Sequence, residues 1–129
     1  MVRQAMILTA MLIASIATAA AEDLPKALAG EIVATEHAYC ETSTGYDVGF
    51  VLRRDVDGDG RPDVVLDYSR ALCGGAHEPY CEGERCLLQV WQAAGSGWRK
   101  LFDGKVANWR FDGNGGRSVL IVDGRPLSR

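Results

Sequence analysis

The chain has 129 residues and a formal net charge of −3, with 14 basic residues against 17 acidic ones. This length favours a single domain. The acidic balance argues against a nucleic-acid partner and against binding to an anionic membrane surface.

Residues 1–21 are typical of a signal peptide. Arg3 supplies a positive start, residues 6–16 form an almost entirely apolar run, and small residues precede the acidic pair Glu22 and Asp23. The apolar run is short for a membrane span, which takes roughly 20 residues, so a retained membrane anchor is the less favoured alternative. Cleavage removes one basic residue and leaves 13 basic against 17 acidic residues, a net charge of −4. We therefore predict one small domain, 22–129, that is periplasmic or secreted and has no membrane span.

Helical spacing follows the signal peptide over residues 24–37. The apolar residues that recur at i, i+4, i+8 and i+9 are Leu24, Leu28, Ile32 and Val33. Pro25 suits the first turn of a helix. We expect a short helix that ends near Cys40.

The pattern from Gly45 onward is that of β-strands. The strands are expected at residues 48–53, 64–68, 87–92, 98–102, 106–111 and 118–122. Glycine-rich segments at 93–97 and 112–116 indicate that the last four strands form two hairpins. The stretch 73–86 is rich in Gly, Pro and charge, so we expect a loop that buries no face.

Residues 55–63 fit the pattern D-x-D-x-D-G-x-x-D. Carboxylates at alternating positions wrap a loop around a hard cation, and Ca²⁺ takes oxygen ligands at about 2.3–2.6 Å. Gly60 permits the sharp turn that such a loop needs. The expected ligands are the side chains of Asp55, Asp57, Asp59 and Asp63 and the main-chain carbonyl of Arg61. The alternative is a solvated acidic turn, but crowded carboxylates repel one another unless a cation neutralises them.

The loop departs from an EF-hand, because position twelve is Leu66 where an EF-hand has Glu, and strands are predicted on both sides. Over residues 50–68 it resembles the calcium loops of integrin α-subunit propellers and of FG-GAP or VCBS-type bacterial repeats. The chain carries one copy, so a propeller is not implied. A wider likeness spans roughly residues 38–122 and includes DVDGDGRPDVVLDYS, CGGA and LQVWQ. In this stretch the chain resembles a family of small uncharacterised secreted bacterial proteins, and the likeness implies no activity.

The four cysteines, Cys40, Cys73, Cys81 and Cys86, suggest two disulfides in an exported chain. A zinc site with His77 is the alternative. Three connectivities are open, and we favour Cys40 with Cys73 and Cys81 with Cys86. The first bond joins the end of the helix to the segment that follows the calcium-type loop, and the second closes a short local loop.

These elements predict an α+β fold: an N-terminal helix packed on a small antiparallel sheet of about five or six strands. A calcium-type loop lies in one hairpin, and a disulfide-tied loop crosses one end. Neither histidine (His37 or His77) nor any serine has a recognisable catalytic context, so no enzyme is predicted.

The leading function is an exported, non-enzymatic calcium-binding domain with a structural metal. The alternative is a small binding or inhibitor module for an envelope protein or a glycan, which uses the 73–86 loop or surface tryptophans. The tryptophans are Trp91, Trp98 and Trp109, all on predicted strands, where a core position is the commoner role.

Overall fold

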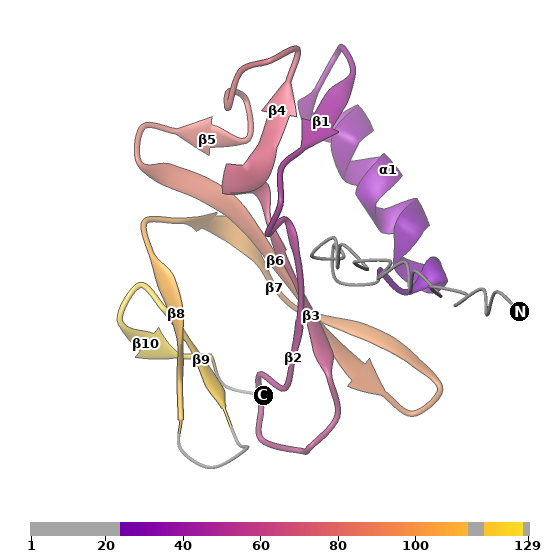
Figure 1. Ribbon diagram of the computed structural model, residues 1–129, viewed down its shortest axis with the longest axis vertical. Helices are drawn as coiled ribbons and strands as arrows, with labels where there is room; N and C mark the ends of the chain where they lie inside the picture. Colours follow the sequence, from indigo (N-terminus) through magenta and orange to yellow (C-terminus); the bar gives the residue numbers. More distant parts are fainter. Residues whose placement is uncertain (1–23, 114–117, 128–129) are drawn as a thin grey trace, which may run out of the picture.

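The computed structural model describes residues 24–113 and 118–127. The predicted signal peptide therefore lies outside the described residues, as does the centre of the 112–116 turn. The described chain combines one short α-helix with antiparallel β-structure, in agreement with the α+β class (Figure 1). Within the described ranges, no helix is long and apolar enough to span a bilayer.

The helix α1 (Ala29–Tyr39) follows a 3₁₀ turn, η1 (Lys26–Leu28), close to the predicted helix. The buried positions of this segment are Leu28, Ile32 and Thr35. They follow i, i+4, i+7 spacing and define a narrow stripe. Val33 is 49% exposed, so its place in the predicted apolar face is wrong. The next residue after Ile32 lies about a quarter-turn around the helix, outside this stripe.

Over residues 24–113 and 118–127, the strands form three antiparallel sheets. In chain order they are β1 (Thr44–Tyr46), β2 (Val51–Arg54), β3 (Asp63–Asp67), β4 (Ala71–Cys73), β5 (Cys81–Glu82), β6 (Arg85–Ala94), β7 (Gly97–Val106), β8 (Trp109–Asp112), β9 (Val119–Val122) and β10 (Arg125–Pro126). The main sheet has β3 between β2 and β6, while β5 and β7 also pair with β6. β1 pairs with β4, and β9 lies between β8 and β10.

The single sheet predicted from the sequence is therefore divided. Strand β7 ends at Val106, and the chain turns at Ala107 and Asn108 before it enters β8. The N–H groups of both turn residues donate to the carboxylate of Asp123, at 2.9 and 3.0 Å. This contact holds the turn against the segment that follows β9, so β8 pairs with β9 and does not extend the main sheet.

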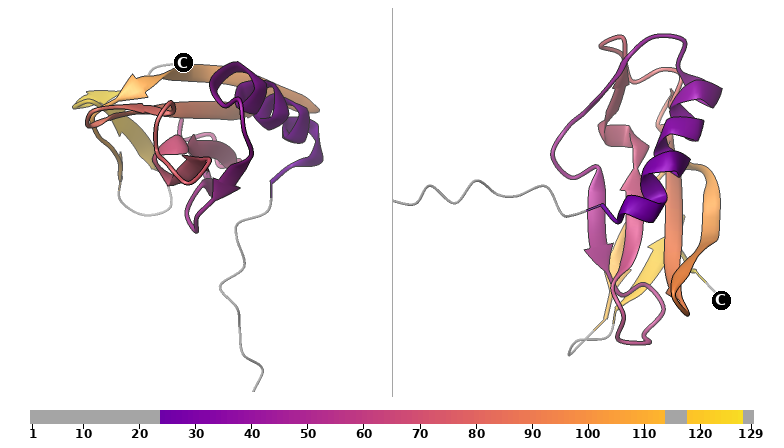
Figure 2. Two further views of the ribbon diagram at one scale, coloured as in Figure 1. Left: turned by 90° about the horizontal axis from the view of Figure 1, so that it is seen from above. Right: turned by 90° about the vertical axis from the view of Figure 1, so that its right-hand side faces the viewer.

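Two hydrophobic clusters lie on opposite faces of β3, because successive side chains of a strand point to opposite faces. Val64 and Leu66 join the cluster that contains Leu28 and Ile32 of the helical segment. Val65 joins the second cluster, whose other buried members are Val56, Leu88, Val90, Val106, Leu120 and Val122. Figure 2 shows α1 and the β8–β10 sheet at opposite ends of the molecule.

The stretch 73–86 differs from the predicted loop. It contains β5, and Tyr80 is fully buried in the first cluster. The Tyr80 hydroxyl lies 2.8 Å from the Thr44 hydroxyl and hydrogen-bonds to it. The expectation that this stretch buries no face is wrong at Tyr80, because one aromatic residue among turns can still reach the core.

Both favoured cysteine pairs are disulfides in the structure. Cys40 bonds to Cys73 and links the end of α1 to β4. Cys81 bonds to Cys86 across the β5–β6 pair, where the two residues lie opposite each other. All four cysteines are therefore bonded to one another, and none is a free thiol.

Candidate metal centre

The acidic loop joins two paired strands of the main sheet. Residues 55–62 connect β2 to β3, and Arg54 pairs with Asp63 at the base of the loop. The predicted hairpin is thus present, although β2 begins at Val51 and not at Val48, which is 77% exposed. β3 is central in the sheet, whereas β2 pairs with β3 alone among the described strands.

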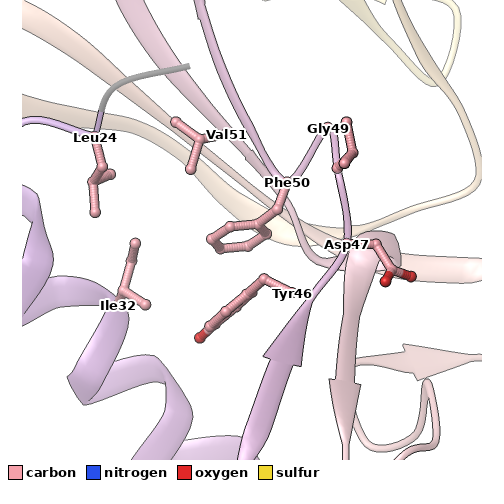
Figure 3. A pocket seen from close by; sticks show the side chains of 8 residues that line it. Leu24, Ile32, Tyr46, Asp47, Gly49, Phe50 and Val51 are labelled. Atoms are coloured by element: carbon pink, nitrogen blue, oxygen red, sulfur yellow. The ribbon is translucent and has the colours of Figure 1, made fainter. Parts of the chain in front are cut away.

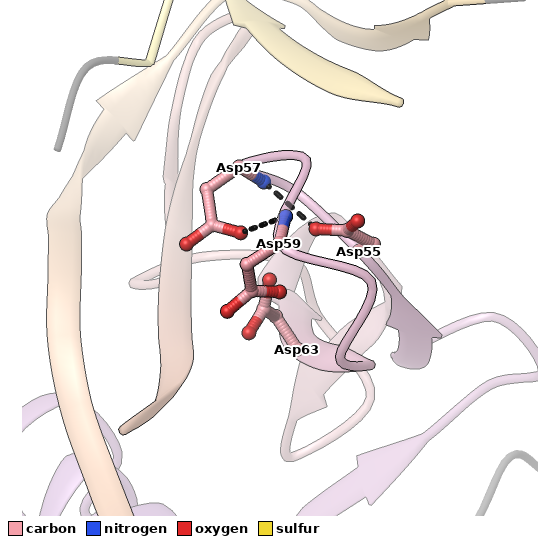
Figure 4. A group of neighbouring side chains, drawn as sticks. All are labelled: Asp55, Asp57, Asp59 and Asp63. Atoms are coloured by element: carbon pink, nitrogen blue, oxygen red, sulfur yellow. Dashed lines mark hydrogen bonds between the residues drawn. The ribbon is translucent and has the colours of Figure 1, made fainter. Parts of the chain in front are cut away.

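Four carboxylates converge inside this loop. Each of the four aspartates offers one oxygen, and these oxygens lie within 4.8 Å of one another (Figure 4). Two oxygens on opposite sides of one Ca²⁺ are about 4.6–5.2 Å apart, twice the usual metal–oxygen distance. The spread of the cluster therefore suits a single ion of that size. The four residues are Asp55, Asp57, Asp59 and Asp63.

Backbone N–H groups hold the Asp55 carboxylate at the centre of the turn. One of its oxygens accepts from Asp57 at 3.1 Å and Gly58 at 2.8 Å, and the other accepts from Gly60 at 2.8 Å. Gly58 and Gly60 have φ angles of 79° and 83°, a left-handed conformation that glycine adopts without steric strain. The loop can thus wrap around Asp55 because glycine stands at both positions.

The pKa of Asp55 lies below its ordinary value. Burial alone raises this pKa, but the N–H groups of Gly60, Asp57 and Gly58 together outweigh burial and favour the charged form. The loop therefore presents Asp55 as a carboxylate, which is the form that binds a cation.

Asp57 and Asp59 continue the same arrangement along the loop. The N–H of Asp59 donates to Asp57 Oδ1 at 3.2 Å, and the N–H of Arg61 donates to Asp59 Oδ1 at 2.8 Å. A carboxylate has about four lone-pair sites, so the single N–H bond to Asp59 leaves that carboxylate with capacity for a metal. The guanidinium of Arg61 donates to the Gly95 carbonyl at 2.9 Å, which ties the loop to the β6–β7 turn. The main-chain carbonyl of Arg61 remains a predicted ligand.

Asp63 is the buried member of the cluster, with no exposed surface. Its Oδ2 accepts from the N–H of Val56, and its Oδ1 accepts from the N–H of Ala93 on β6, both at 2.9 Å. Asp63 thus fastens the start of the loop to the neighbouring strand as well as facing the other carboxylates.

The pKa of Asp63 is raised above its ordinary value. Burial is the largest cause, and the negative charges of Asp57 and Asp59 add to it, while the two N–H bonds act in the opposite direction. A bound cation would reverse the effect of the neighbouring charges. A cation in the loop would therefore favour the ionised form of Asp63.

Gln92 connects the loop to β6 and β7. Its amide Nε2 donates to Asp57 Oδ2, and its Oε1 accepts from the guanidinium of Arg99. Gln92 is 7% exposed, so its amide is largely shielded from water. No pattern of residues indicates this contact, because a glutamine on a strand is ordinary and its partner lies on a different hairpin.

The loop also contacts the C-terminal sheet. The N–H of Leu120 donates to the Val56 carbonyl at 3.4 Å, and the Ser118 hydroxyl donates to the Asp55 carbonyl. Val56 is 1% exposed and belongs to the second hydrophobic cluster. The acidic loop therefore touches three parts of the fold: its own hairpin, the β6–β7 hairpin and β9.

The three tryptophans do not form one exposed surface. Trp91 is 7% exposed and packs in the first cluster, whereas Trp98 and Trp109 are partly buried against different clusters. This agrees with the core or half-core role that strand tryptophans usually have.

A separate apolar hollow of about 380 Å³ lies between the helical segment and the β1–β2 turn. Its walls include Leu24, Ile32, Tyr46 and Phe50, and Asp47 turns its carboxylate away from the rings (Figure 3). The hydroxyl of Tyr46 donates to the Glu36 carboxylate. The hollow therefore presents almost wholly apolar surface and offers little that would orient a polar ligand.

Comparison with known protein families, with curated proteins and with solved structures found no match.

Proposed function

We propose that this protein is an exported calcium-binding domain in which Asp55, Asp57, Asp59 and Asp63 hold one structural ion. The observation that carries the proposal is the convergence of four carboxylate oxygens within 4.8 Å, one of them from a fully buried side chain. Burying a carboxylate beside three others is unfavourable unless a cation offsets the repulsion.

Calcium fits this set of ligands better than other common metals do. The cluster supplies oxygen atoms alone, with no histidine nitrogen or thiolate, and oxygen ligands suit hard cations. Mg²⁺ needs near-ideal octahedral geometry at about 2.0–2.1 Å, so its opposite ligands lie only about 4.0–4.2 Å apart. The four oxygens lie within 4.8 Å of one another, which leaves room for the larger Ca²⁺ ion.

The contacts of the loop support a structural role for the proposed ion. Asp63 bonds to β6 through Ala93, and Val56 bonds to β9 through Leu120. An ion that fixes the loop would thereby hold three segments that are distant in sequence. Metal binding to a site absent from the unfolded chain contributes directly to the free energy of folding.

Removing two ligands should abolish stabilisation by calcium. At a calcium concentration 100 times the Kd, the wild-type domain should gain about 2.7 kcal/mol of unfolding free energy. Asp57→Ala combined with Asp59→Ala should show the same melting temperature in calcium and in chelator, because no neighbouring group replaces the lost charge. Thermal unfolding of residues 22–129 measures both effects.

The matched control is Glu41→Ala combined with Glu78→Ala, which removes the same charge from exposed positions away from the loop. This variant should keep the full response to calcium. A wild-type melting temperature that is identical in calcium and in chelator refutes the metal site.

Hydrogen exchange should show which segments the ion holds. Chelation should first lower protection across residues 48–68, the hairpin that carries the acidic loop. It should also lower protection at the amides of Ala93 and Leu120, which bond to the loop region. The paired centre of β6 and β7 should exchange later. A uniform loss across all strands would instead mean that calcium controls global folding, and no change would reduce the loop to an acidic turn.

A further inference from the structure

Gln92 lies between the acidic loop and β7, and its side chain is largely shielded from water. It stands on β6 with 7% of its surface exposed. Its amide Nε2 donates to Asp57 Oδ2, and its Oε1 accepts from the guanidinium of Arg99 at 2.5 Å. One buried amide therefore joins a carboxylate of the loop to a cation on the neighbouring strand.

The two partners fix the orientation of this amide. A guanidinium can only donate hydrogen bonds, and an ionised carboxylate can only accept them. Both contacts form together only when Oε1 faces Arg99 and the NH₂ group faces Asp57. The opposite orientation would place an oxygen against the carboxylate and an NH₂ group against the guanidinium, so neither hydrogen bond would form.

The register between β6 and β7 brings Arg99 to this position. Gln92 lies directly opposite Arg99, because a register shift after Val90 leaves one extra residue on β7. Regular pairing beyond Val90 would put Lys100 opposite Gln92. Arginine presents its N–H groups in a rigid plane, whereas lysine is a flexible point charge. The irregular pairing thus supplies the residue that is better suited to hold the amide.

The contact from Gln92 holds the Asp57 carboxylate in one orientation. Asp57 Oδ1 accepts from the N–H of Asp59 at 3.2 Å, while Oδ2 accepts from Gln92. The carboxylate is therefore oriented before an ion arrives, and the entropy cost of ordering it is met on folding and not on binding. Loss of a group that holds a metal ligand typically weakens metal binding by roughly 10–100-fold.

We propose that Gln92 is a positioning residue of the calcium site, and that Arg99 acts through it by keeping the amide in the donating orientation. This inference rests on the proposed function and adds a determinant of affinity from outside the acidic loop. Gln92 contacts a ligand and not the ion itself. A residue on the β6–β7 hairpin thereby sets how tightly residues 55–63 bind calcium.

Calorimetric titration of residues 22–129 with CaCl₂ tests this role. Gln92→Met keeps the length of the side chain but has no NH₂ group, so it should weaken calcium binding about tenfold or more. Gln89→Met is the matched control. Gln89 stands on the same strand and is 2% exposed, but its amide donates to Thr35 and Asp103, away from the loop. Its substitution should leave the calcium affinity unchanged.

A double-mutant cycle shows whether Gln92 acts through Asp57 or only through the fold. Asp57→Asn keeps an oxygen for the N–H of Asp59 and turns an NH₂ group toward Gln92, where it cannot accept a hydrogen bond. In this background Gln92→Met should cause no further loss of calcium affinity, because the contact is already broken. A merely structural role would give the same loss in both backgrounds.

A measurement on the wild type carries the test if Gln92→Met does not fold. In NMR spectra, the side-chain NH₂ resonances of Gln92 should shift on saturation with calcium, because the ion withdraws electron density from the carboxylate that accepts their hydrogen bond. The NH₂ resonances of Gln89 should keep their positions.

Three results would overturn the role of Gln92: undiminished calcium affinity in folded Gln92→Met, an equal loss in the Asp57→Asn background, or unshifted Gln92 resonances in the calcium-saturated protein. Each of them is compatible with a wild type that binds calcium. A wild type that shows no binding heat and no calcium-dependent stabilisation would refute the metal site itself, so the two failures are distinguishable.

Discussion

Replacing Asp63 with Ala should destabilise the folded domain by about 2–4 kcal/mol even in chelator. The buried carboxylate accepts hydrogen bonds from the N–H groups of Val56 and Ala93. Each N–H that loses its partner in a buried position costs about 1–3 kcal/mol. The substitution also removes the desolvated charge of Asp63, which offsets part of this cost. The expected total therefore lies below the upper limit for two lost hydrogen bonds. Urea denaturation in chelator measures the change in unfolding free energy.

Asp59→Ala is the matched comparison, because Asp59 belongs to the same cluster but is exposed. In chelator it should change the unfolding free energy by no more than about 0.5 kcal/mol. Both variants should lose the response to calcium. Equal effects of the two substitutions in chelator would contradict the structural role assigned to Asp63.

The pH dependence of this effect has a definite sign. The pKa of Asp63 is raised in the folded state, chiefly by burial. The stability that such a group contributes is fully present below its unfolded pKa, about 3.9, and is lost as the pH rises through the folded pKa. In chelator, Asp63→Ala should therefore destabilise the domain more at pH 4 than at pH 7. Asp55, whose pKa is lowered, contributes with the opposite dependence.

Removing the bond between Cys40 and Cys73 should cost about 3–4 kcal/mol. Its cysteines are 33 residues apart in sequence, so the bond closes a long loop in the unfolded chain. In the chain-entropy account, the stabilisation by a disulfide grows with the logarithm of the loop length. The variant Cys40→Ser with Cys73→Ser should show this loss in urea denaturation, in the presence of calcium.

The second disulfide provides the control. Cys81 and Cys86 are 5 residues apart, for which the same account gives about 2 kcal/mol. The β5–β6 pairing also holds these residues opposite each other without the bond. A greater loss from Cys81→Ser with Cys86→Ser than from the first pair would contradict the loop-length argument.

The features that could be predicted from the residues alone are those that depend on neighbouring positions in the chain. The four aspartates and Gly60 lie within residues 55–63, so the turn and the convergence of the carboxylates follow from local backbone geometry. The β6–β7 hairpin likewise follows from its short connection, where Gly95 has a φ of 56°. The helix is indicated by spacing that repeats within a few turns.

The distant residues that contact these local elements are seen only in the folded protein. Gln92, Ala93 and Leu120 reach the acidic loop because β3 lies beside β6 and because β9 packs near Val56. Hydrophobic periodicity gives the burial of a strand but not its neighbours, so strand order and the division into three sheets were not predictable. The burial of Tyr80 has the same origin, because it depends on long-range contacts that no local pattern of residues specifies.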